Sequence, residues 1–280
     1  MGIEINTKEI LNKWETELLY RIDNVKKEYG KPWLSIIKVG DREDSKLYVN
    51  NKLRKAEKLG IETSLFELDE KTRQQDLNEL MSVMRNPTIL QLPLPDHLDA
   101  AEAMSHLKPE LDVDGLTTYQ KGLLVDGREE AMVPATALGV VRILESITNI
   151  KGTKVAIVSR SELIGKPLAQ LILQKNGYPV ILHSKVPIMN MFDEIANSEI
   201  IVTGCGQRAI FDHRHFRTSG QVIIDCSMNK VPGVKGVGDV NKEDVLIYSH
   251  NHIASGFGHT GPATVMGLMN NVVKYYEMMM

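Results

Sequence analysis

Tyr48 and Lys52 stand four residues apart in the stretch Tyr-Val-Asn-Asn-Lys, and their side chains could do chemistry together. If the stretch is helical, the phenol and the amine lie on the same face, because four residues make about one turn. A phenol ring can lie flat against a ring system, and an amine with a lowered pKa can move a proton near neutral pH. Taken alone, the pair is better explained as two amphipathic side chains with solvated tips.

Gln91 and Asp114 each lie in a short segment rich in turn-forming residues. Gln91 opens Gln-Leu-Pro-Leu-Pro at the exit of a predicted strand, and Asp114 lies in Asp-Val-Asp-Gly. Structural roles can explain each residue taken singly. Gln91 could cap the strand exit before Pro93, and Asp114 could form a turn before Gly115.

A second group of candidates follows the strand-like segment Lys-Val-Ala-Ile-Val-Ser. The next residues read Ser-Arg-Ser-Glu-Leu-Ile-Gly, where a dinucleotide fingerprint would read G-x-G-x-x-G. Ser159 and Ser161 take the expected glycine positions, Arg160 lies between them, and Gly165 remains. A strand, a tight polar turn and a helix whose first N–H groups can receive phosphate predict a nucleotide site.

The end of the following strand indicates which nucleotide is bound. An NAD site usually has an acidic residue there, whereas a basic residue accommodates the extra phosphate of NADP. This chain has His183, Ser184 and Lys185 and no carboxylate, and Arg160 adds a further donor. Solvated loop residues are the alternative, but the pattern favours NADP. Gly204, which ends the strand-like segment Glu-Ile-Ile-Val-Thr-Gly, completes the predicted cofactor site.

Strand-like and helix-like segments alternate along the chain, which predicts a mainly parallel α/β sheet. Helices are expected at 7–28, 46–60, 72–85, 132–147, 163–177 and 261–279, and strands at 33–40, 63–69, 88–95, 154–159, 178–184, 199–204, 221–227 and, more weakly, 245–249. The regularity breaks around 112–122, so we expect a domain boundary near residue 115. Tyr48 and Lys52 then follow the first strand, at the kind of strand-to-helix junction where open α/β sheets bind ligands.

Composition excludes several classes of partner. With 280 residues, 42% hydrophobic residues and a net charge of −3, the chain can build a core and has no concentrated basic character, so no nucleic-acid partner is expected. No apolar run is long enough for a membrane span and no secretory leader is present, so a cytoplasmic protein without a membrane partner is expected. Cys205 and Cys226 are expected to be reduced, small core residues, and their spacing fits no metal site.

The segments Tyr48–Lys52, Gln91–Pro95, Asp112–Gly115, Ser159–Pro167 and Leu182–Lys185 occur in the order and at about the spacing found in one enzyme family. By the order and spacing of these segments, the chain resembles the bifunctional methylenetetrahydrofolate dehydrogenase/cyclohydrolase family. The resemblance implies oxidation of methylenetetrahydrofolate with NADP, followed by hydrolysis of the methenyl form to formyltetrahydrofolate. It also implies a homodimer.

The same resemblance implies a fold and residue roles. Residues 1–115, with a C-terminal helix at 261–280 that returns to them, would form a folate-binding catalytic α/β domain. Residues 116–260 would form a Rossmann-like NADP domain. Lys52 and Tyr48 match the family's catalytic lysine and the tyrosine before it, Gln91 the supporting glutamine, and Asp114 the aspartate that anchors folate. In these roles the carboxamide of Gln91 would fix the position of the Lys52 amine, and the two oxygens of Asp114 would accept paired N–H groups of the substrate.

Three segments depart from the family pattern. Pro-Ala-Thr-Ala at 134–137 replaces Pro-Cys-Thr-Pro, and Ser159 replaces a glycine. Ser-Gly-Phe-Gly-His-Thr-Gly-Pro at 255–262 replaces the family's Pro-Val-Pro-Gly-Gly-Val-Gly-Pro, which puts Phe257 and His259 at the expected pocket. Gly258 and Gly261 are retained and are predicted to contact substrate.

Two rival interpretations remain. A shikimate-dehydrogenase-like enzyme has a similar two-domain plan, but the Gln-Leu-Pro-Leu-Pro and Asp-Val-Asp-Gly pair argues against it. A folate- or nucleotide-binding protein that has lost catalysis would explain the altered loop, but the presence of Lys52, Gln91 and Asp114 argues against that.

Overall fold

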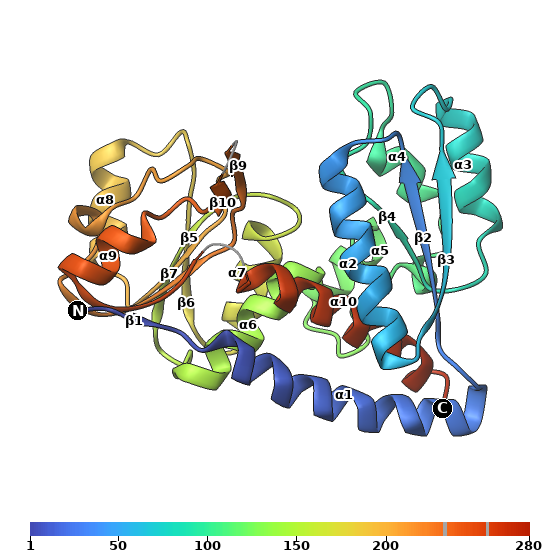
Figure 1. Cartoon of the computed structure of the whole chain (residues 1–280), viewed down its shortest axis with the longest axis horizontal. Helices are drawn as coiled ribbons and strands as arrows, with labels where there is room; N and C mark the ends of the chain where they lie inside the picture. Colours follow the sequence, from blue (N-terminus) through green and yellow to red (C-terminus); the bar gives the residue numbers. More distant parts are fainter. Residues whose placement is uncertain (232–233, 256–257) are drawn as a thin grey trace. The chain divides into compact units, whose positions relative to one another are not determined.

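The computed structural model describes residues 1–231, 234–255 and 258–280, and the chain divides into two compact units (Figure 1). The three-stranded unit comprises Trp14–Ala135 and Val265–Met280. The six-stranded unit comprises Met1–Lys13 and Thr136–Thr264. The C-terminal helix therefore belongs mainly to the three-stranded unit, as the predicted return of this helix to the first domain requires.

The three-stranded unit is built from most of α1 (Thr7–Tyr29), β2 (Trp33–Val39), α2 (Glu43–Leu59), β3 (Glu62–Leu68), α3 (Gln74–Val83), β4 (Thr88–Leu90), α4 (Ala100–Ser105), α5 (Thr118–Val125) and most of α10 (Thr260–Glu277). Its strands lie in the order β3-β2-β4, and both pairs are parallel. The chain leaves β2 for β3 on one side and reaches β4 on the other. Ligands of open α/β sheets bind at the carboxyl ends of strands where the order reverses in this way, which here means β2 and β4.

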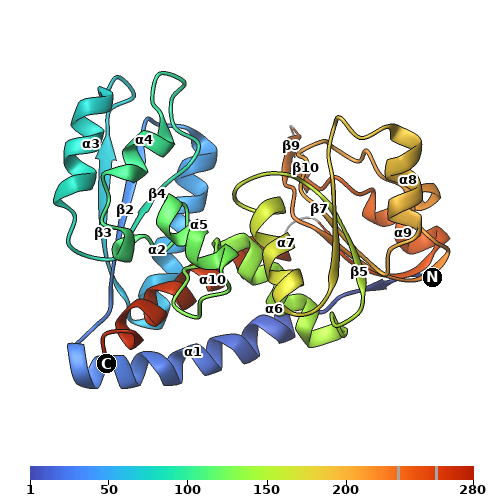
Figure 2. The ribbon, with the colours of Figure 1, turned by 180° about the vertical axis from the view of Figure 1, so that it is seen from behind.

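Helices cover both faces of this sheet. Figures 1 and 2 show α2 on one side of the strands and α3 on the other. On the α3 side, Ile37 and Leu90 from the sheet pack in one apolar cluster with Leu77, Met81 and Met104 from α3 and α4. This packing fixes where β2 and β4 end, and so fixes the residues that follow them.

Helices α1 and α10 are joined by side-chain contacts within this unit. The guanidinium of Arg21 donates to Glu277 Oε1 at 2.8 Å and to Asn270 Oδ1 at 2.6 Å. Leu18 and Ile22 lie four residues apart on one face of α1, and both are fully buried. The unit is therefore closed by the last helix of the chain.

The six-stranded unit is built from β1 (Ile3–Glu4), α6 (Ala135–Ile147), β5 (Lys154–Val158), α7 (Gly165–Gln174), β6 (Tyr178–Leu182), α8 (Ile188–Ala196), β7 (Ile200–Thr203), β8 (Ser219–Asp225), β9 (Asn229–Val231), β10 (Val234–Val237), α9 (Lys242–Tyr248) and β11 (His250–Ala254). Its main sheet has the order β1-β11-β8-β7-β5-β6 and is parallel throughout. Figures 1 and 2 show α8 and α9 on one side of this sheet and α7 on the other. The unit is thus a doubly wound Rossmann-like sheet, with its strand order reversing between β5 and β7.

The division of the chain differs from the predicted boundary near residue 115. Gln120 donates to Pro109 O at 2.9 Å and accepts from Met132 N at 2.8 Å, which ties the segment after residue 115 to the three-stranded unit. At the other end, β1 pairs with β11, so the first residues belong to the six-stranded unit. The assignment of folate and NADP to the two stretches stays a prediction.

The weak strand expected at 245–249 is wrong. These residues belong almost entirely to helix α9, whose first turn is capped by the Asn241 side chain accepting from Asp244 N at 3.3 Å. Val245 is buried, whereas Ile247 and Tyr248 are more than half exposed. A short apolar run does not distinguish a helix from a strand by its period, and the strand proper, β11, begins only at His250.

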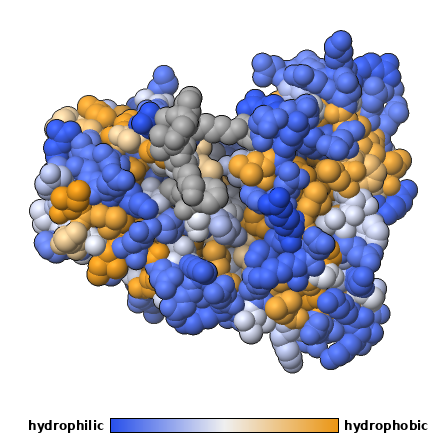
Figure 3. Space-filling view, viewed as in Figure 1, coloured by the Kyte–Doolittle hydropathy of each residue, from blue (hydrophilic) through white to orange (hydrophobic). Residues whose placement is uncertain are grey.

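The surface is that of an ordinary globular protein. Figure 3 shows hydrophilic residues over much of the visible face, with hydrophobic ones interspersed, as is normal for folded domains. Among the described residues, no helix has the length and apolar character needed to cross a bilayer.

Candidate active site

Helix α2 carries both Tyr48 and Lys52, one turn apart on the same face. Only 9% of Lys52 is exposed, whereas Tyr48 is 39% exposed. The helix ends at Gly60, whose φ of 73° lets its N–H reach the carbonyls of the last turn. The lysine is thus a buried side chain on a well-terminated helix and not a solvated surface cation.

Gln91 holds the Lys52 amine in place. Its backbone N–H still donates to Ile37 O at 2.8 Å, so it continues the pairing of β4 with β2. Its amide nitrogen donates to Leu92 O at 2.6 Å, which leaves Oε1 to accept from Lys52 Nζ at 2.9 Å. The two residues meet at the carboxyl end of β4, where the strand order of this sheet reverses.

Asp114 is the charged neighbour of Lys52. Burial lowers the pKa of Lys52 below its usual 10.5, and the negative charge of Asp114 opposes that shift. Burial likewise raises the pKa of Asp114, against the opposing effects of Lys52 and of the Ala135 N–H that donates to it. Both shifts favour neutral side chains, which suits a site that must hold or move a proton.

Asp112 is a residue of this site that sequence reasoning did not single out. It is fully buried, and its Oδ1 accepts from Gly115 N at 2.9 Å while Oδ2 accepts from Thr117 N at 2.7 Å. It also accepts from Asp114 N at 3.2 Å, so it shapes the turn that presents Asp114. Burial raises the pKa of Asp112 to about 6. Its sequence signal is its place in Asp-Val-Asp-Gly, a segment in which only Asp114 is assigned a role.

The turn at Gly115 admits no side chain. Its φ is +70°, and a Cβ placed there would lie 2.2 Å from Met132 O. Only glycine therefore fits at position 115 of Asp-Val-Asp-Gly, because the backbone of another segment approaches it closely. Asp114 is indeed in a turn before Gly115, but this does not exclude a role in binding, because it also lies beside Lys52.

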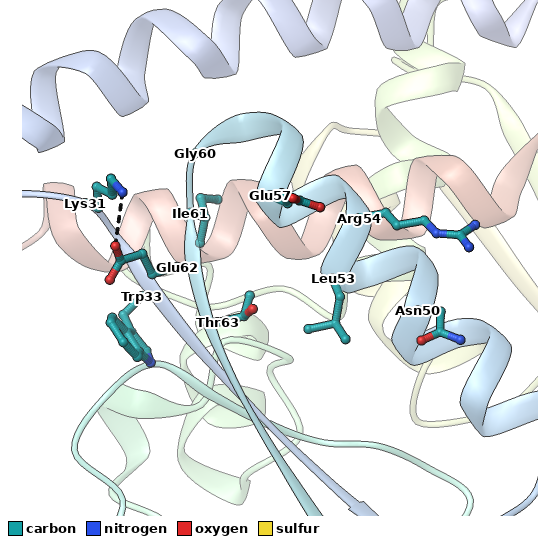
Figure 4. A pocket seen from close by; sticks show the side chains of 10 residues that line it. All are labelled: Lys31, Trp33, Asn50, Leu53, Arg54, Glu57, Gly60, Ile61, Glu62 and Thr63. Atoms are coloured by element: carbon teal, nitrogen blue, oxygen red, sulfur yellow. Dashed lines mark hydrogen bonds and ion pairs between the residues drawn. The ribbon is translucent and has the colours of Figure 1, made fainter.

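The opposite face of α2 lines a different hollow, of about 640 Å³ (Figure 4). Asn50, Leu53 and Arg54 of the helix are among its lining residues, about half a turn away from Tyr48 and Lys52. The residues that line it also include the ion pair Lys31–Glu62. None of the predicted catalytic or binding residues lines this hollow, so we place the candidate site on the Lys52 face of the helix.

A pocket of about 590 Å³ in the six-stranded unit contains most of the predicted cofactor residues. It lies at the carboxyl ends of β5, β6 and β7, which include the point where the strand order reverses. Of the predicted residues, those lining it are Ser159, Arg160, Ser161, His183, Ser184 and Gly204. The serine and arginine donors fit the phosphates of a dinucleotide.

Gly165 does not line the pocket but makes its turn possible. A Cβ at this position would lie 2.1 Å from Ser159 O, so only glycine lets α7 begin this close to the strand exit. Ser161 Oγ accepts from Ile164 N at 3.1 Å and lies 3.2 Å from Ser159 Oγ. Ser159 and Ser161 thus stabilise this turn by side-chain hydrogen bonds, at positions where a dinucleotide fingerprint has glycines.

The lining of the pocket also contains residues that sequence reasoning missed. They are Cys205, Gln207, Ile210 and Phe211, in the loop that follows β7. Both cysteines are free, as expected, but Cys205 is exposed and Cys226 is only partly buried. The prediction that both are small core residues is wrong, because each lies just beyond the end of a strand, where the chain leaves the sheet.

His259 is turned toward the N-terminal segment of its own unit. Its Nδ1 lies 3.0 Å from Thr7 Oγ1, and its Nε2 lies 2.9 Å from Glu4 Oε1. Gly258 has a φ of +97°, a conformation that favours glycine, whereas a Cβ at Gly261 would meet nothing closer than 3.7 Å. Gly256 and Phe257 lie outside the described residues, so the structure describes this loop only in part.

Comparison with known proteins identifies the family of both halves of the chain. Residues 5–114 match the model of the tetrahydrofolate dehydrogenase/cyclohydrolase catalytic domain, and residues 134–280 match that of the NAD(P)-binding domain. The bifunctional protein FolD of Lactobacillus acidophilus is 35% identical over 98% of this chain and 97% of its own length. That of Rickettsia bellii is 32% identical over 99% of each chain.

Solved structures agree with these matches over the whole length. The bifunctional FolD methylenetetrahydrofolate dehydrogenase/cyclohydrolase of Campylobacter jejuni has a TM-score of 0.92 at 26% identity, covering 100% of both chains. FolD of Trypanosoma brucei, solved with NADP and an inhibitor, has a TM-score of 0.90 at 28% identity, covering 99% of this chain and 98% of that one. With both domain models matched in order and relatives above 30% identity along nearly all of it, this chain belongs to the tetrahydrofolate dehydrogenase/cyclohydrolase family.

Proposed function

We propose that this chain oxidises methylenetetrahydrofolate to methenyltetrahydrofolate with NADP and hydrolyses the methenyl form to formyltetrahydrofolate. The observation that carries the proposal is the buried contact of Lys52 Nζ with Gln91 Oε1, 2.9 Å long, beside Asp114. Membership of the family in both halves of the chain supports it. The shikimate-dehydrogenase-like alternative is not favoured, because both halves match the folate family.

Lys52 is proposed as the group that handles protons during hydrolysis. A free lysine has a pKa near 10.4. To act as a base near pH 7, the lysine needs a pKa lowered by about three units, which corresponds to roughly 4 kcal/mol. Burial lowers the pKa of Lys52 in the required direction. Gln91 fixes the amine through a neutral oxygen, which orients it without the full charge that would hold the ammonium form in place.

Asp114 and Tyr48 are proposed to bind the substrate. The carboxylate of Asp114 can accept paired N–H groups from the aminopyrimidine edge of the pterin. Tyr48 remains 39% exposed, so its ring is accessible to stack on the substrate. Asp112 contributes indirectly, because it fixes the turn that carries Asp114.

The pocket of the six-stranded unit is proposed to hold NADP, which supplies the hydride acceptor. Arg160 and Ser184 both line this pocket, on the exits of neighbouring strands, and would contact the phosphate that distinguishes NADP from NAD. Ser159, Ser161, His183 and Gly204 complete the proposed contacts, and Gly165 allows the turn. Gly258 and Gly261 remain proposed substrate contacts.

A spectrophotometric assay of the purified protein tests the proposal. We expect methylenetetrahydrofolate and NADP to yield NADPH, and the methenyl substrate to be hydrolysed without any nucleotide. Shikimate as the preferred substrate would contradict the proposal, and so would binding of both ligands without turnover. We further propose a cytoplasmic homodimer with tetrahydrofolate derivatives as its ligands and without nucleic-acid or membrane partners. Sedimentation equilibrium tests the dimer.

A further inference from the structure

The loop after β7 forms one wall of the nucleotide pocket. Its residues Gly204, Cys205 and Gln207 all line the pocket, as do Ser159 and Ser161 of the turn at the end of β5. A loop that contacts a ligand through its backbone and short side chains must be held in one conformation, because the ligand can offer little to order it. The structure shows what holds this loop.

Three consecutive backbone N–H groups of the loop donate hydrogen bonds either to the Asp239 carboxylate or to the Ser227 hydroxyl, which is itself bound to that carboxylate. Cys205 N donates to Asp239 Oδ2 at 2.8 Å, and Gln207 N donates to Asp239 Oδ1 at 2.7 Å. Between them, Gly206 N donates to Ser227 Oγ at 3.1 Å, and that hydroxyl donates to Asp239 Oδ2 at 2.7 Å. Both carboxylate oxygens are thus occupied by the pocket loop.

The backbone around Asp239 holds the far end of the same loop. Ala209 N donates to Gly238 O and Phe211 N to Asp239 O, both at 3.0 Å. This backbone is tied to Asp225, because Val240 N donates to Asp225 Oδ2 at 2.9 Å and a Cβ at Gly238 would lie 1.8 Å from the same oxygen. The anchor therefore cannot shift without disturbing a second buried carboxylate.

Asp239 is fully buried, and the donors described above are neutral N–H and O–H groups. Burying a carboxylate costs free energy unless hydrogen bonds compensate for the lost hydration. We therefore ascribe the role of Asp239 to the loop geometry that its hydrogen bonds impose. An asparagine would fit the same space but could not replace it. Whichever way the amide turned, its NH₂ group would face the N–H of either Cys205 or Gln207.

We propose that Asp239, assisted by Ser227, is a positioning residue for NADP, because it holds the loop 204–211 in the conformation that binds the cofactor. The inference rests on the proposed function, in which NADP occupies this pocket. If the loop sampled other conformations, the apparent affinity would fall in proportion to the fraction of molecules that remain competent to bind.

The test compares the parent chain with Asp239→Asn by calorimetric titration with NADP and by hydrolysis of the methenyl substrate. We expect NADP to bind about tenfold or more weakly to the variant, since stranding one buried N–H destabilises the bound loop by about one power of ten in affinity. Hydrolysis needs no nucleotide, so its rate should be unchanged. A general structural defect would not separate the two readouts in this way.

Gln221→Leu is the matched control. Gln221 is also fully buried in the six-stranded unit, and its amide donates to Ile195 O and Ser198 O, neither of which lines the pocket. This variant should lose thermal stability while binding NADP as the parent does. If it binds NADP as weakly as Asp239→Asn, or if Asp239→Asn binds normally, the inference is overturned.

Ser227→Ala decides the matter if Asp239→Asn does not fold. It removes the hydroxyl that links Gly206 N to Asp239, and it should weaken NADP binding several-fold without changing hydrolysis. Normal NADP binding by this variant would overturn the inference. A parent chain that binds no NADP would instead overturn the proposed function itself.

Discussion

The amine of Lys52 lies 2.9 Å from Oε1 of Gln91, so a helix side chain and the first residue after β4 form one buried contact. The acceptor is a neutral amide whose nitrogen is already committed to Leu92 O. The amide therefore orients the amine without supplying a full negative charge to hold its proton. Asp114 supplies a charge nearby, and its effect opposes that of burial on the pKa of Lys52.

Lys52→Met should abolish hydrolysis of the methenyl substrate and leave the fold intact. Methionine retains much of the apolar length of lysine but cannot accept a proton, and removing a general base typically costs about 10²–10⁴-fold in rate. Steady-state hydrolysis and circular dichroism measure the two expectations.

Lys58→Met on the same helix is the control for that variant. Lys58 is largely exposed and pairs with Glu15, so its loss should change stability slightly and hydrolysis not at all. Parent-like hydrolysis by Lys52→Met would show that the lysine is not the proton-handling group.

The pH dependence of hydrolysis should report the Lys52 amine. The fraction of Lys52 in the neutral, proton-accepting form increases as pH rises, and the hydrolysis rate should increase with it. Because burial lowers the pKa of Lys52 below 10.5, the inflection of the pH–rate profile should lie below that value. Gln91→Glu would place a carboxylate beside the ammonium, raise the pKa of Lys52 and move the inflection to higher pH. The rate near pH 7 should fall accordingly.

A pH–rate profile of both proteins, recorded from mildly acidic to alkaline pH, checks this shift. An inflection that does not move between the parent and Gln91→Glu would mean that another group controls the profile. A shift to lower pH would contradict the assigned direction of the charge effect.

Much of the fold was predictable from the sequence, because its signals are local. Alternating strands and helices, the glycine that ends α2 and the polar turn after β5 each depend on a few adjacent residues. Tyr48 and Lys52 were predictable as a pair for the same reason. The expected strand-to-helix junction favoured a functional role for them, and the family resemblance implied which role.

Contacts between distant segments were not predictable. Asp239 reads as an ordinary polar residue after a glycine, and only the folded chain brings it to the loop at Cys205 and Gln207. Asp112 is not predictable as a site residue, because in its segment the aspartate two residues later is the one that matches a family role. The strand wrongly expected at 245–249 failed because apolar periodicity is ambiguous over five residues.

Arg160→Ala should remove most of the preference for NADP over NAD. Arg160 lines the nucleotide pocket, and a charge-assisted contact with phosphate contributes about 1.5–3 kcal/mol, or roughly ten- to a hundredfold. The ratio of kcat/KM for the two cofactors measures the effect. Arg214→Ala, which removes an exposed arginine paired with Asp212, is the control and should keep the parent ratio. Equal efficiency with both cofactors in the parent would refute the assignment.

The loop at 255–262 should limit the two activities unequally. Hydride transfer needs its reacting atoms about 3–3.5 Å apart, so a small displacement costs rate, whereas hydrolysis needs no nicotinamide. Lys52, Gln91 and Asp114 all belong to the three-stranded unit, and the loop belongs to the other. Replacing the loop by Pro-Val-Pro-Gly-Gly-Val-Gly-Pro should therefore raise dehydrogenase turnover selectively.

The same replacement should lower stability, because the described ends of the loop carry polar anchors. His259 contacts Thr7 and Glu4, Ser255 Oγ donates to Asp225 Oδ2 at 2.7 Å, and Thr260 Oγ1 donates to Asp225 O at 3.2 Å. Each such hydrogen bond contributes about 0.5–1.5 kcal/mol, so losing all four should destabilise the six-stranded unit by roughly 2–6 kcal/mol. His259→Gly alone should show part of this loss in a thermal melt. If both activities rise in parallel, or neither changes while the melting temperature falls, the loop anchors the fold without limiting hydride transfer.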